Sequence, residues 1–581
     1  MSENKSMTGY PSIDKPWLKY YTAEDLAIQV PKCTIYQNIY DRNKKFPEDV
    51  AILYYGNRIR YKTLFSEVEI CAKALRQIGI RPGDCVTLCT AGVPEAIYLV
   101  LACSRIGAIA NFINPLFTKE QMIDRINDTE AKWIFILDAM YSYIEAALTD
   151  TCVENVVILS ATNSIPLLLS KLMYIKGEAR KIVKHGNGKQ RFLRWKDFCA
   201  FSRSFVGSPD VPYQPDTSTV MVYSSGSTGA SKGILLTNDG INATINNYSI
   251  YNMHIERRDT FLQMIPVWFS TGIVISVLMP LAKGTSVIPE PKFSKETFLK
   301  DLIKYKPAVT LTATSLWNFV VTSGIDVDMS NMKYPTTGGE KILPLDELRI
   351  NEYLIRNGCK KRLYKGYGMC ELGSEISGDN DAPNYSGKPG GSGYPFLGAT
   401  VSAFDISTDK ELPYGKHGEI RVLSPARMKG YYKNPDATEA FFKKDELGNI
   451  WGCTGDIGYV DEDGEVFILG RATDHFRREN GEIVFLFDIE AEILKNESIS
   501  QCKVVDIEDN GTKKLVAHLV FQEGLENREE IISEIWSNLR KALPSYMVPD
   551  YYKIRLSMPV HTNGKRDVGA LKRDLDDLKQ M

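Results

Sequence analysis

The hydrophobic residues of this chain follow two alternating patterns over its first part. Between residues 34 and 89, and again between 91 and 138, short apolar runs rich in β-branched residues alternate with segments of helical periodicity. Buried strands that alternate with helices are typical of α/β architecture. Residues 1 to about 30 lack this rhythm, and we expect them to form an N-terminal arm.

Later stretches add further elements to this pattern. Residues 259–288 are apolar enough for a buried helix flanked by strands, and residues 387–422 have the frequent turns and short strands of a small β subdomain. The C-terminal part predicts a small α+β domain of roughly 110 residues. Its strands and single long helix are expected at 501–509, 513–522, 527–543 and 551–557.

Composition narrows the class of protein without identifying it. The chain has 581 residues, of which 44% are hydrophobic and 24% charged, and this is typical of a globular protein with sizeable cores. With a net charge of -2, the chain lacks the net positive charge that is typical of nucleic-acid-binding proteins. The eleven cysteines include no Cys-x-x-Cys pair, and the N-terminus has no apolar signal core, so we expect reduced thiols and a cytoplasmic location.

The segment Tyr223 to Gly233, YSSGSTGASKG, is the clearest chemical signal. A buried strand is expected before it, and a strand end followed by a helix after it. Its glycines can bring backbone amides close to phosphate oxygens, and its hydroxyls and one lysine add donors and positive charge. The expected phosphate-binding residues are Ser224, Ser225, Gly226, Ser227, Thr228, Gly229 and Lys232. The alternative, a flexible Gly/Ser linker, seldom lies between a buried strand and a helix.

This loop differs from the common mononucleotide-binding loop, because Lys232 is followed by Gly233 and Ile234 rather than by Ser or Thr. It resembles the signature loop of the adenylate-forming superfamily, which includes acyl-CoA synthetases, peptide-synthetase adenylation domains and luciferases. Ser231 stands where that family usually has Pro, and Asn238 where it often has His. The resemblance extends over nearly the whole chain and is closest to AMP-dependent acid:CoA ligases.

A second motif, YKGYGMCELGS, resembles the family's Tyr-Gly-x-Thr-Glu. The resemblance implies that Tyr367 stacks on adenine next to Gly368, and that Glu371 and Thr228 hold magnesium on the triphosphate. Cys370 stands where Thr is usual. Because a thiol is a weaker hydrogen-bond donor than a hydroxyl, we expect its contact with the α-phosphate to be impaired or replaced.

Further motifs follow in the order found in the family. The resemblance places a glycine pair and a glutamate beside the adenine, an aspartate of a Thr-Gly-Asp motif on the ribose, and an arginine on ribose or phosphate. These residues are Gly338, Gly339, Glu340, Asp456 and Arg471. It also implies that Lys565, after the turn Asn563-Gly564, is the catalytic lysine that stabilises charge between the carboxylate and the α-phosphate.

The resemblance also implies where the acid binds. The family's Pro-x-Phe-His-x-x-Gly motif is matched by Pro266, Trp268, Phe269 and Gly272, with Phe269 in place of the His, and Thr312 is expected on the pocket wall. No carboxylate lies between residues 263 and 280, which argues against an α-amino acid because its buried ammonium would have no partner. A medium- or long-chain fatty acid is our first expectation, and an aryl acid is the alternative.

The expected fold class is α/β. A large N-terminal AMP-binding domain at 1–470, made of two α/β sheets and a small β-barrel, precedes a hinge at 471–474 and a smaller mobile α+β domain at 475–581. The family usually has Asp or Lys at the position of Thr473. Closure of the small domain after adenylation is expected to form a CoA channel near Gly481.

These features predict an enzyme that uses ATP, Mg²⁺ and CoA to convert a carboxylic acid to acyl-AMP and then to a thioester. One alternative is a ligase that loads the pantetheine of a separate carrier protein. Another is a degenerate protein that binds nucleotide or acyl ligand without turnover. Residues 164–190, an apolar half followed by a basic half, predict either a surface helix packed on the protein or contact with an anionic membrane.

Overall fold

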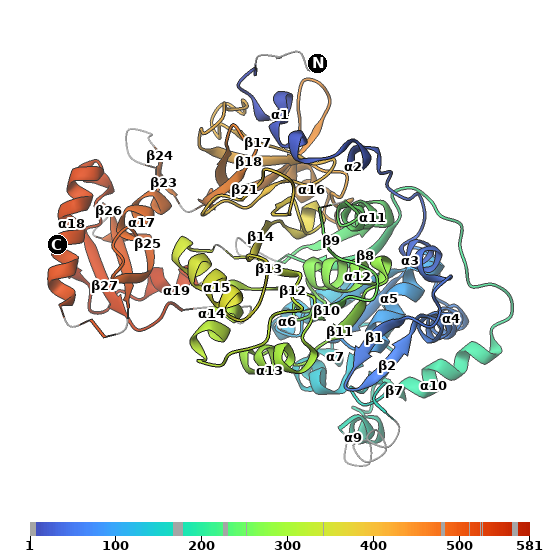
Figure 1. Ribbon diagram of the computed structural model, residues 1–581. Coiled ribbons are helices and arrows are strands. Elements are labelled where there is room, and N and C mark those ends of the chain that lie inside the picture. Colours follow the sequence, from blue (N-terminus) through green and yellow to red (C-terminus); the bar gives the residue numbers. More distant parts are fainter. Residues whose placement is uncertain are drawn as a thin grey trace.

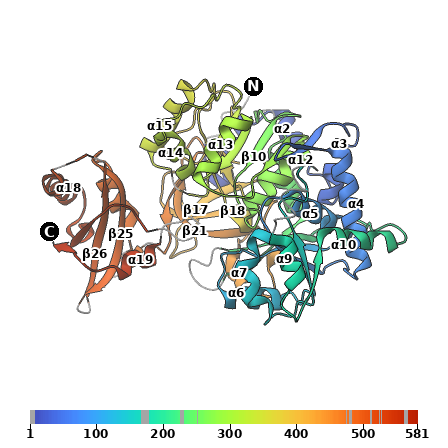
Figure 2. The same ribbon diagram turned by 90° about the horizontal axis from the view of Figure 1, so that it is seen from below.

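The computed structural model describes residues 7–166, 178–224, 231–250, 252–340, 342–473, 475–477, 483–509, 512–522, 524–525, 527–559 and 567–580. It shows a large body with two extended sheets, a smaller antiparallel sheet beside them, and a separate C-terminal lobe (Figures 1 and 2). The expected α/β class is therefore confirmed.

The first large sheet has eight strands in the order β19-β9-β8-β4-β3-β5-β6-β7. Strands β4, β3, β5, β6 and β7 run parallel, and β4 also pairs in parallel with β8, whereas β8 with β9 and β9 with β19 are antiparallel. Their bounds are β3 Cys85–Cys89, β4 Ile109–Phe112, β5 Trp133–Leu137, β6 Asn155–Leu159, β7 Arg191–Arg194, β8 Ser218–Tyr223, β9 Gly233–Thr237 and β19 Gly430–Tyr431.

The second large sheet has nine strands in the order β16-β15-β14-β13-β12-β10-β11-β1-β2. Its central strands are parallel, as the alternation of strands and helices predicts. The bounds are β1 Val50–Tyr54, β2 Asn57–Arg60, β10 Thr260–Gln263, β11 Ser286–Pro289, β12 Val309–Thr312, β13 Tyr334–Gly338, β14 Tyr364–Tyr367, β15 Ser377–Gly378 and β16 Tyr394–Pro395.

Helices cover both sheets and fill the space between them. One large core joins α3, α4, α5, α11, η4 and α12 to strands of both sheets, while α13, α14 and α15 form a second core with the nine-stranded sheet. The bounds are α3 Ile35–Asn43, α4 Tyr61–Gln77, α5 Pro94–Ile106, α6 Lys119–Asp128, α7 Tyr141–Leu148, α10 Trp195–Ala200, α11 Asn238–Asn247, η4 Thr271–Leu278, α12 Met279–Lys283, α13 Lys295–Tyr305, α14 Thr314–Thr322 and α15 Pro344–Arg356.

The expected β subdomain is a five-stranded antiparallel sheet of β17 Thr400–Phe404, β18 Gly418–Leu423, β20 Phe442–Lys444, β21 Ile450–Val460 and β22 Val466–Arg471, with α16 Pro435–Phe441 beside it. The N-terminal arm contains α1 Pro11–Asp14, η1 Pro16–Tyr20 and α2 Ala23–Ala27. Strand β21 pairs with β18, β20 and β22, so it is the centre of this sheet.

The C-terminal lobe has a hydrophobic core of its own around Trp536, Leu519 and Ile489. Its four-stranded sheet consists of β25 Ile499–Asp509, β26 Thr512–Phe521, β27 Tyr551–Arg555 and β28 Lys579–Gln580. The lobe also contains β23 His475–Arg477, β24 Ile483–Phe485, α17 Leu486–Ile493, α18 Arg528–Ala542 and α19 Val568–Arg573. It stands apart from the body in both views (Figures 1 and 2).

The apolar half of the segment at 164–190 lies largely outside the described residues. The basic half contains α9 Glu178–His185, whose Ile182 and Val183 pack against the core of the eight-stranded sheet. This part of the segment therefore packs on the protein itself. Within the described ranges, no helix is both long and apolar enough to cross a bilayer.

Candidate active site

The neck of the glycine-rich loop is closed by hydrogen bonds that continue the β8–β9 pairing. The Ser224 amide donates to the Lys232 carbonyl at 3.0 Å, and the Lys232 amide donates to Ser224 Oγ at 3.0 Å. Ser231, only 2% exposed, donates from its hydroxyl to the Ser224 carbonyl at 2.8 Å. The serine that replaces the family's proline therefore supplies a bond that proline cannot make.

The loop joins two antiparallel strands, and α11 begins only after β9. This agrees with the expected strand end followed by a helix. The expected phosphate donors Ser225, Gly226, Ser227, Thr228 and Gly229 lie outside the described residues, so their placement stays a prediction.

Lys232 and Glu371, which are 139 positions apart, meet at one tyrosine. The Tyr431 hydroxyl donates to Glu371 Oε1 at 3.0 Å, and Lys232 Nζ lies 5.1 Å from the centre of the Tyr431 ring. Burial and the neighbouring Glu371 raise the pKa of Tyr431, so the phenol stays protonated and acts as the donor. Lys232 makes no ion pair within the described part of the chain, which leaves its ammonium able to bind an anion.

Backbone pairing explains why Tyr431 is at this position. Strand β19 pairs with β9 so that Tyr431 lies opposite Ile234, and the Tyr432 amide donates to the Gly233 carbonyl at 2.7 Å. The Met428 amide donates to the Glu371 carbonyl at 2.8 Å, which fixes the neighbouring segment. The sequence analysis did not identify Tyr431, because its role depends on pairing between strands almost 200 residues apart.

A second cluster joins Tyr367, Asp456 and Arg471. The Tyr367 hydroxyl donates to Asp456 Oδ2 at 2.6 Å, and Arg471 Nε lies 3.1 Å from Asp456 Oδ1. The Asp456 carboxylate and Tyr367 lie on different sheets, β21 and β14, and Arg471 ends β22. Burial, followed by the charge of Asp456, raises the pKa of Tyr367 well above its usual value, so it too is a hydrogen-bond donor.

The predicted adenine-site glycines are at positions that demand glycine. A Cβ on Gly368 would lie 1.8 Å from the Ser374 carbonyl oxygen, and Gly339 has a left-handed φ of +83°. A Cβ on Gly338 would lie 3.1 Å from the Gly366 carbonyl oxygen. Glu340 Oε1 accepts from the Ser315 amide at 3.0 Å, so it caps the first turn of α14.

The expected acid-binding residues lie around the start of η4, a π-helix, a form often found at functional sites. Trp268 and Phe269 have ring centres 6.2 Å apart and pack against the large core. Gly272 has no room for a side chain, since a Cβ would lie 2.0 Å from the Pro266 carbonyl oxygen. Thr312 is fully buried at the end of β12.

Two predicted residues of the C-terminal domain, Lys565 and Gly481, lie outside the described residues.

Cys370 begins the short helix η5, Cys370–Leu372, directly before Glu371, and it contributes to the raised pKa of Tyr431. The thiol therefore lies near the Tyr431 phenol.

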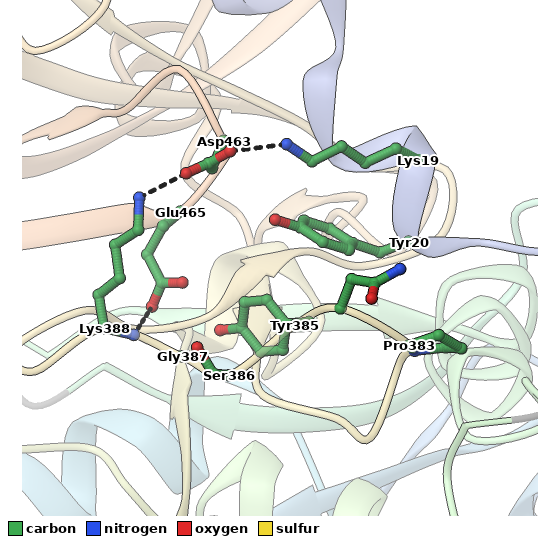
Figure 3. A pocket seen from close by; sticks show the side chains of 10 residues that line it. Lys19, Tyr20, Pro383, Tyr385, Ser386, Gly387, Lys388, Asp463 and Glu465 are labelled. Atoms are coloured by element: carbon green, nitrogen blue, oxygen red, sulfur yellow. Dashed lines mark hydrogen bonds and ion pairs between the residues drawn. The ribbon is translucent and has the colours of Figure 1, made fainter.

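One polar cavity of about 350 Å³ lies away from these clusters, between the N-terminal arm, the 383–388 loop and the β21–β22 turn (Figure 3). Its charges pair with one another: Asp463 contacts both Lys19 and Lys388 at 2.8 Å. Burial raises the pKa of Glu465 in its wall to about 7. None of the described residues expected to bind ATP or acid lines this cavity. The ion pair between Lys19 and Asp463 in its wall joins the N-terminal arm to the β21–β22 turn.

Comparison with known proteins identifies the family and the relatives of this chain. The sequence model of the AMP-binding enzyme family matches residues 39–432. A long-chain-fatty-acid–CoA ligase of Bacillus subtilis is 24% identical over 557 residues, covering 95% of this chain and 96% of the relative. The 4-coumarate–CoA ligase 1 of Petroselinum crispum is 26% identical, covering 81% of this chain and 82% of the relative.

Solved structures share the fold. ATP-bound MatB from Rhodopseudomonas palustris superposes with a TM-score of 0.77 at 21% identity, over 94% of this chain and 99% of that one. The anthranilate CoA ligase AuaEII, bound to anthranoyl-AMP, gives a TM-score of 0.76 at 18% identity, over 94% and 98%. The family match over most of the chain shows that this protein belongs to the AMP-binding enzyme family.

Proposed function

We propose that this protein is an AMP-forming acid:CoA ligase, which converts a carboxylic acid and ATP to acyl-AMP and then transfers the acyl group to CoA. The main support is that Lys232 and Glu371 converge on Tyr431 at the neck of the glycine-rich loop. This arrangement brings a cation and an oxygen ligand to the place where the triphosphate of ATP would bind.

In this proposal the acid's carboxylate oxygen attacks the α-phosphorus of ATP, the bond from that phosphorus to the bridging oxygen breaks, and pyrophosphate leaves. Lys232 neutralises charge on the phosphates, and Lys565 stabilises the charge that develops at the α-phosphate. Tyr367 stacks on the adenine, while Asp456 accepts hydrogen bonds from the ribose hydroxyls. The thiol of CoA then attacks the acyl carbonyl and AMP leaves.

Magnesium fits this donor set. Glu371 is 8% exposed and uses Oε1 to accept from Tyr431, whereas no hydrogen bond to its Oε2 is present among the described residues. Those residues contain no cluster of three or more metal-binding side chains. Mg²⁺ in phosphate-transfer sites is commonly held by one or two carboxylates together with substrate phosphates, so Glu371 would supply the protein ligand and Mg²⁺ would offset the triphosphate charge.

The substrate we propose first is a medium- or long-chain fatty acid. The segment around Trp268, Phe269 and η4 is apolar. The related long-chain-fatty-acid–CoA ligase of Bacillus subtilis aligns with nearly the whole chain. No carboxylate lies between residues 263 and 280 to pair with an amino group on the acid.

One observation favours an aryl acid as the second candidate. The indole N–H of Trp268 is buried without a hydrogen-bond partner in the described part of the chain. A ring hydroxyl or ether oxygen on the acid would accept from this group and remove the cost of an unsatisfied donor. The 4-coumarate–CoA ligase relatives are named for such an acid.

For the second step we propose that residues 471–474 are the hinge between the domains at 1–470 and 475–581. The clusters described above lie before this segment, except that Arg471 is its first residue, and Lys565 and Gly481 lie after it. Rotation at the hinge would withdraw Lys565 after adenylation and bring Gly481 to the thiol channel.

The test is to measure AMP and pyrophosphate release from ATP with a panel of fatty and aryl acids, with and without CoA. AMP formed in equal amount to acyl-CoA for one acid class supports the ligase and identifies its substrate. Pyrophosphate release without thioester would indicate a carrier-protein acceptor instead. ATP binding without acid-dependent turnover would contradict the enzymatic proposal.

A further inference from the structure

A second cavity, of about 420 Å³, is lined by the N-terminal arm, the end of α11 and the start of the five-stranded sheet. This volume is within the range of small-molecule sites in proteins. Most of its wall is apolar and comes from Trp17, Leu18, Leu26, Ile28, Val30 and Leu397. None of the residues assigned to ATP or acid in the proposed function lines it.

Two asparagines line the cavity with side-chain amides that no described residue binds. Asn246 and Asn247, at the end of α11, are 3% and 6% exposed and both line the cavity. Among the described residues, no hydrogen bond to either side-chain amide is present, and the polar atoms of both amides remain accessible to solvent. Both amides can therefore donate hydrogen bonds to a polar ligand group in the cavity.

The charge in the wall indicates the sign of that group. Lys15 lines the cavity, is half-buried, and makes no ion pair with any described residue. Lys19, four residues along the same arm, instead pairs with Asp463 and lines the other cavity. No acidic residue lines this second cavity, so its polar end is suited to an anion.

We propose that this cavity is a binding site for an amphipathic carboxylate, separate from the active site. The carboxylate would accept hydrogen bonds from Asn246, Asn247 and Lys15. Its hydrocarbon part would lie along the exposed Leu18 and Leu26 of the arm, close to the buried Trp17. A free fatty acid has this chemistry. Binding here requires no adenylation, so the inference stands or falls independently of the proposed activity.

Tryptophan fluorescence tests the site directly, because a bromine atom quenches an indole that it contacts. The intact protein is titrated with 11-bromoundecanoate, and the titration is repeated with Trp17→Phe and Trp268→Phe. We expect a quenching component that disappears in Trp17→Phe and persists in Trp268→Phe. Quenching that is unchanged by Trp17→Phe would overturn the proposal.

Two further variants test the recognition of the head group. Asn246→Leu and Lys15→Gln should each weaken the Trp17-dependent binding about tenfold or more, the scale of one hydrogen bond to a charged group. Lys19→Gln, on the same arm but outside this cavity, should leave the affinity unchanged. Wild-type affinity in both Asn246→Leu and Lys15→Gln would refute the assigned head-group contacts.

A neutral probe and a surface variant guard against misfolding of the buried variants. The alcohol 11-bromoundecanol should bind at least about tenfold more weakly than the acid, because it lacks the charge that Lys15 pairs with. Leu26, 48% exposed, can be changed to Asp without disturbing the core, and Leu26→Asp should also weaken binding. Equal binding of alcohol and acid would overturn the proposed anion site.

Discussion

Replacing Tyr431 with Phe isolates one hydrogen bond in the proposed active site. The change removes the hydroxyl that donates to Glu371 Oε1 at 3.0 Å and keeps the ring that lies 5.1 Å from Lys232 Nζ. Because the Glu371 carboxylate would then be free to turn away from its position, we expect weaker productive binding of magnesium ATP.

The size of the effect follows from the kind of bond that is lost. A hydrogen bond to a charged group contributes about 1.5–3 kcal/mol, and each 1.4 kcal/mol changes an equilibrium or a rate tenfold. We therefore expect kcat/KM for ATP to fall about 10- to 100-fold in Tyr431→Phe. Tyr431→Leu also removes the contact between the ring and Lys232, which contributes about 0.5–1 kcal/mol. We therefore expect its kcat/KM for ATP to fall a few times further than that of Tyr431→Phe.

The assay is the acid-dependent exchange of pyrophosphate into ATP, measured as a function of ATP and magnesium concentration. Tyr432→Phe is the matched control, because this neighbouring tyrosine makes no hydrogen bond to Glu371. Thermal unfolding of each variant separates loss of activity from loss of folded protein.

The interpretation fails if Tyr431→Phe keeps kcat/KM for ATP within about twofold of the wild type while Glu371→Gln lowers it strongly. Tyr431 would then be a packing residue. An equal loss in Tyr432→Phe would also contradict the specific role of Tyr431.

Three further predictions follow from the sequence and the site. Lys565→Ala should lower adenylation roughly a hundred- to thousand-fold, as expected for one preorganised electrostatic group, and pyrophosphate exchange measures this. Gly272→Ala should lower the midpoint of thermal unfolding, because the added Cβ would lie 2.0 Å from the Pro266 carbonyl oxygen and such overpacking costs about 1–3 kcal/mol. Burial raises the pKa of Glu375 from 4.5 to about 7, even though the Tyr248 hydroxyl donates to it, so the wild type should lose stability as pH rises between these values. Glu375→Gln, which has no such titration, should therefore gain stability relative to the wild type between pH 5 and pH 8, by up to about 3 kcal/mol, measured by chemical denaturation at both pH values.

Each of these variants has a control. Lys572, which pairs with Asp506 in the same domain, should tolerate alanine without loss of exchange activity. Ser276→Ala adds no atom to η4 and removes only the hydrogen bond from the Ser276 hydroxyl to the Thr271 carbonyl, so it should lower the unfolding midpoint less than Gly272→Ala does. Glu529 has a lowered pKa because of Lys579 and stays ionised above pH 5, so the stability difference between Glu529→Gln and the wild type should stay constant between pH 5 and pH 8. An unchanged stability difference between the wild type and Glu375→Gln over this pH range would show that Glu375 is ionised in the folded protein throughout.

The sequence predicted the strands and helices well, because their signals are local. β-Branched runs and helical periodicity marked β8, β25, β26 and α18. The glycine-rich loop and the Tyr367 motif could be found for the same reason, since short motifs keep their residues together along the chain. These motifs were sufficient to indicate the family that the comparison then established.

Contacts between distant segments could not be read from the chain. Tyr431 reaches Glu371 only because β19 pairs with β9, and Asp456 meets Tyr367 only where two different sheets come together. The partners of Glu340 and Ser231 are likewise set by packing.

The amino-acid sequence by itself determined the α/β class, the order of the motifs and the kind of chemistry they suit, because these depend on residue type and short spacing. The tertiary structure alone decided which charges have partners. Lys15 and Lys19 lie four residues apart in the same arm, yet Lys19 pairs with Asp463, whereas Lys15 lines a cavity and makes no ion pair with any described residue. The physical reason is that pairing and burial depend on which distant segments pack against a residue, and the local sequence does not contain that information.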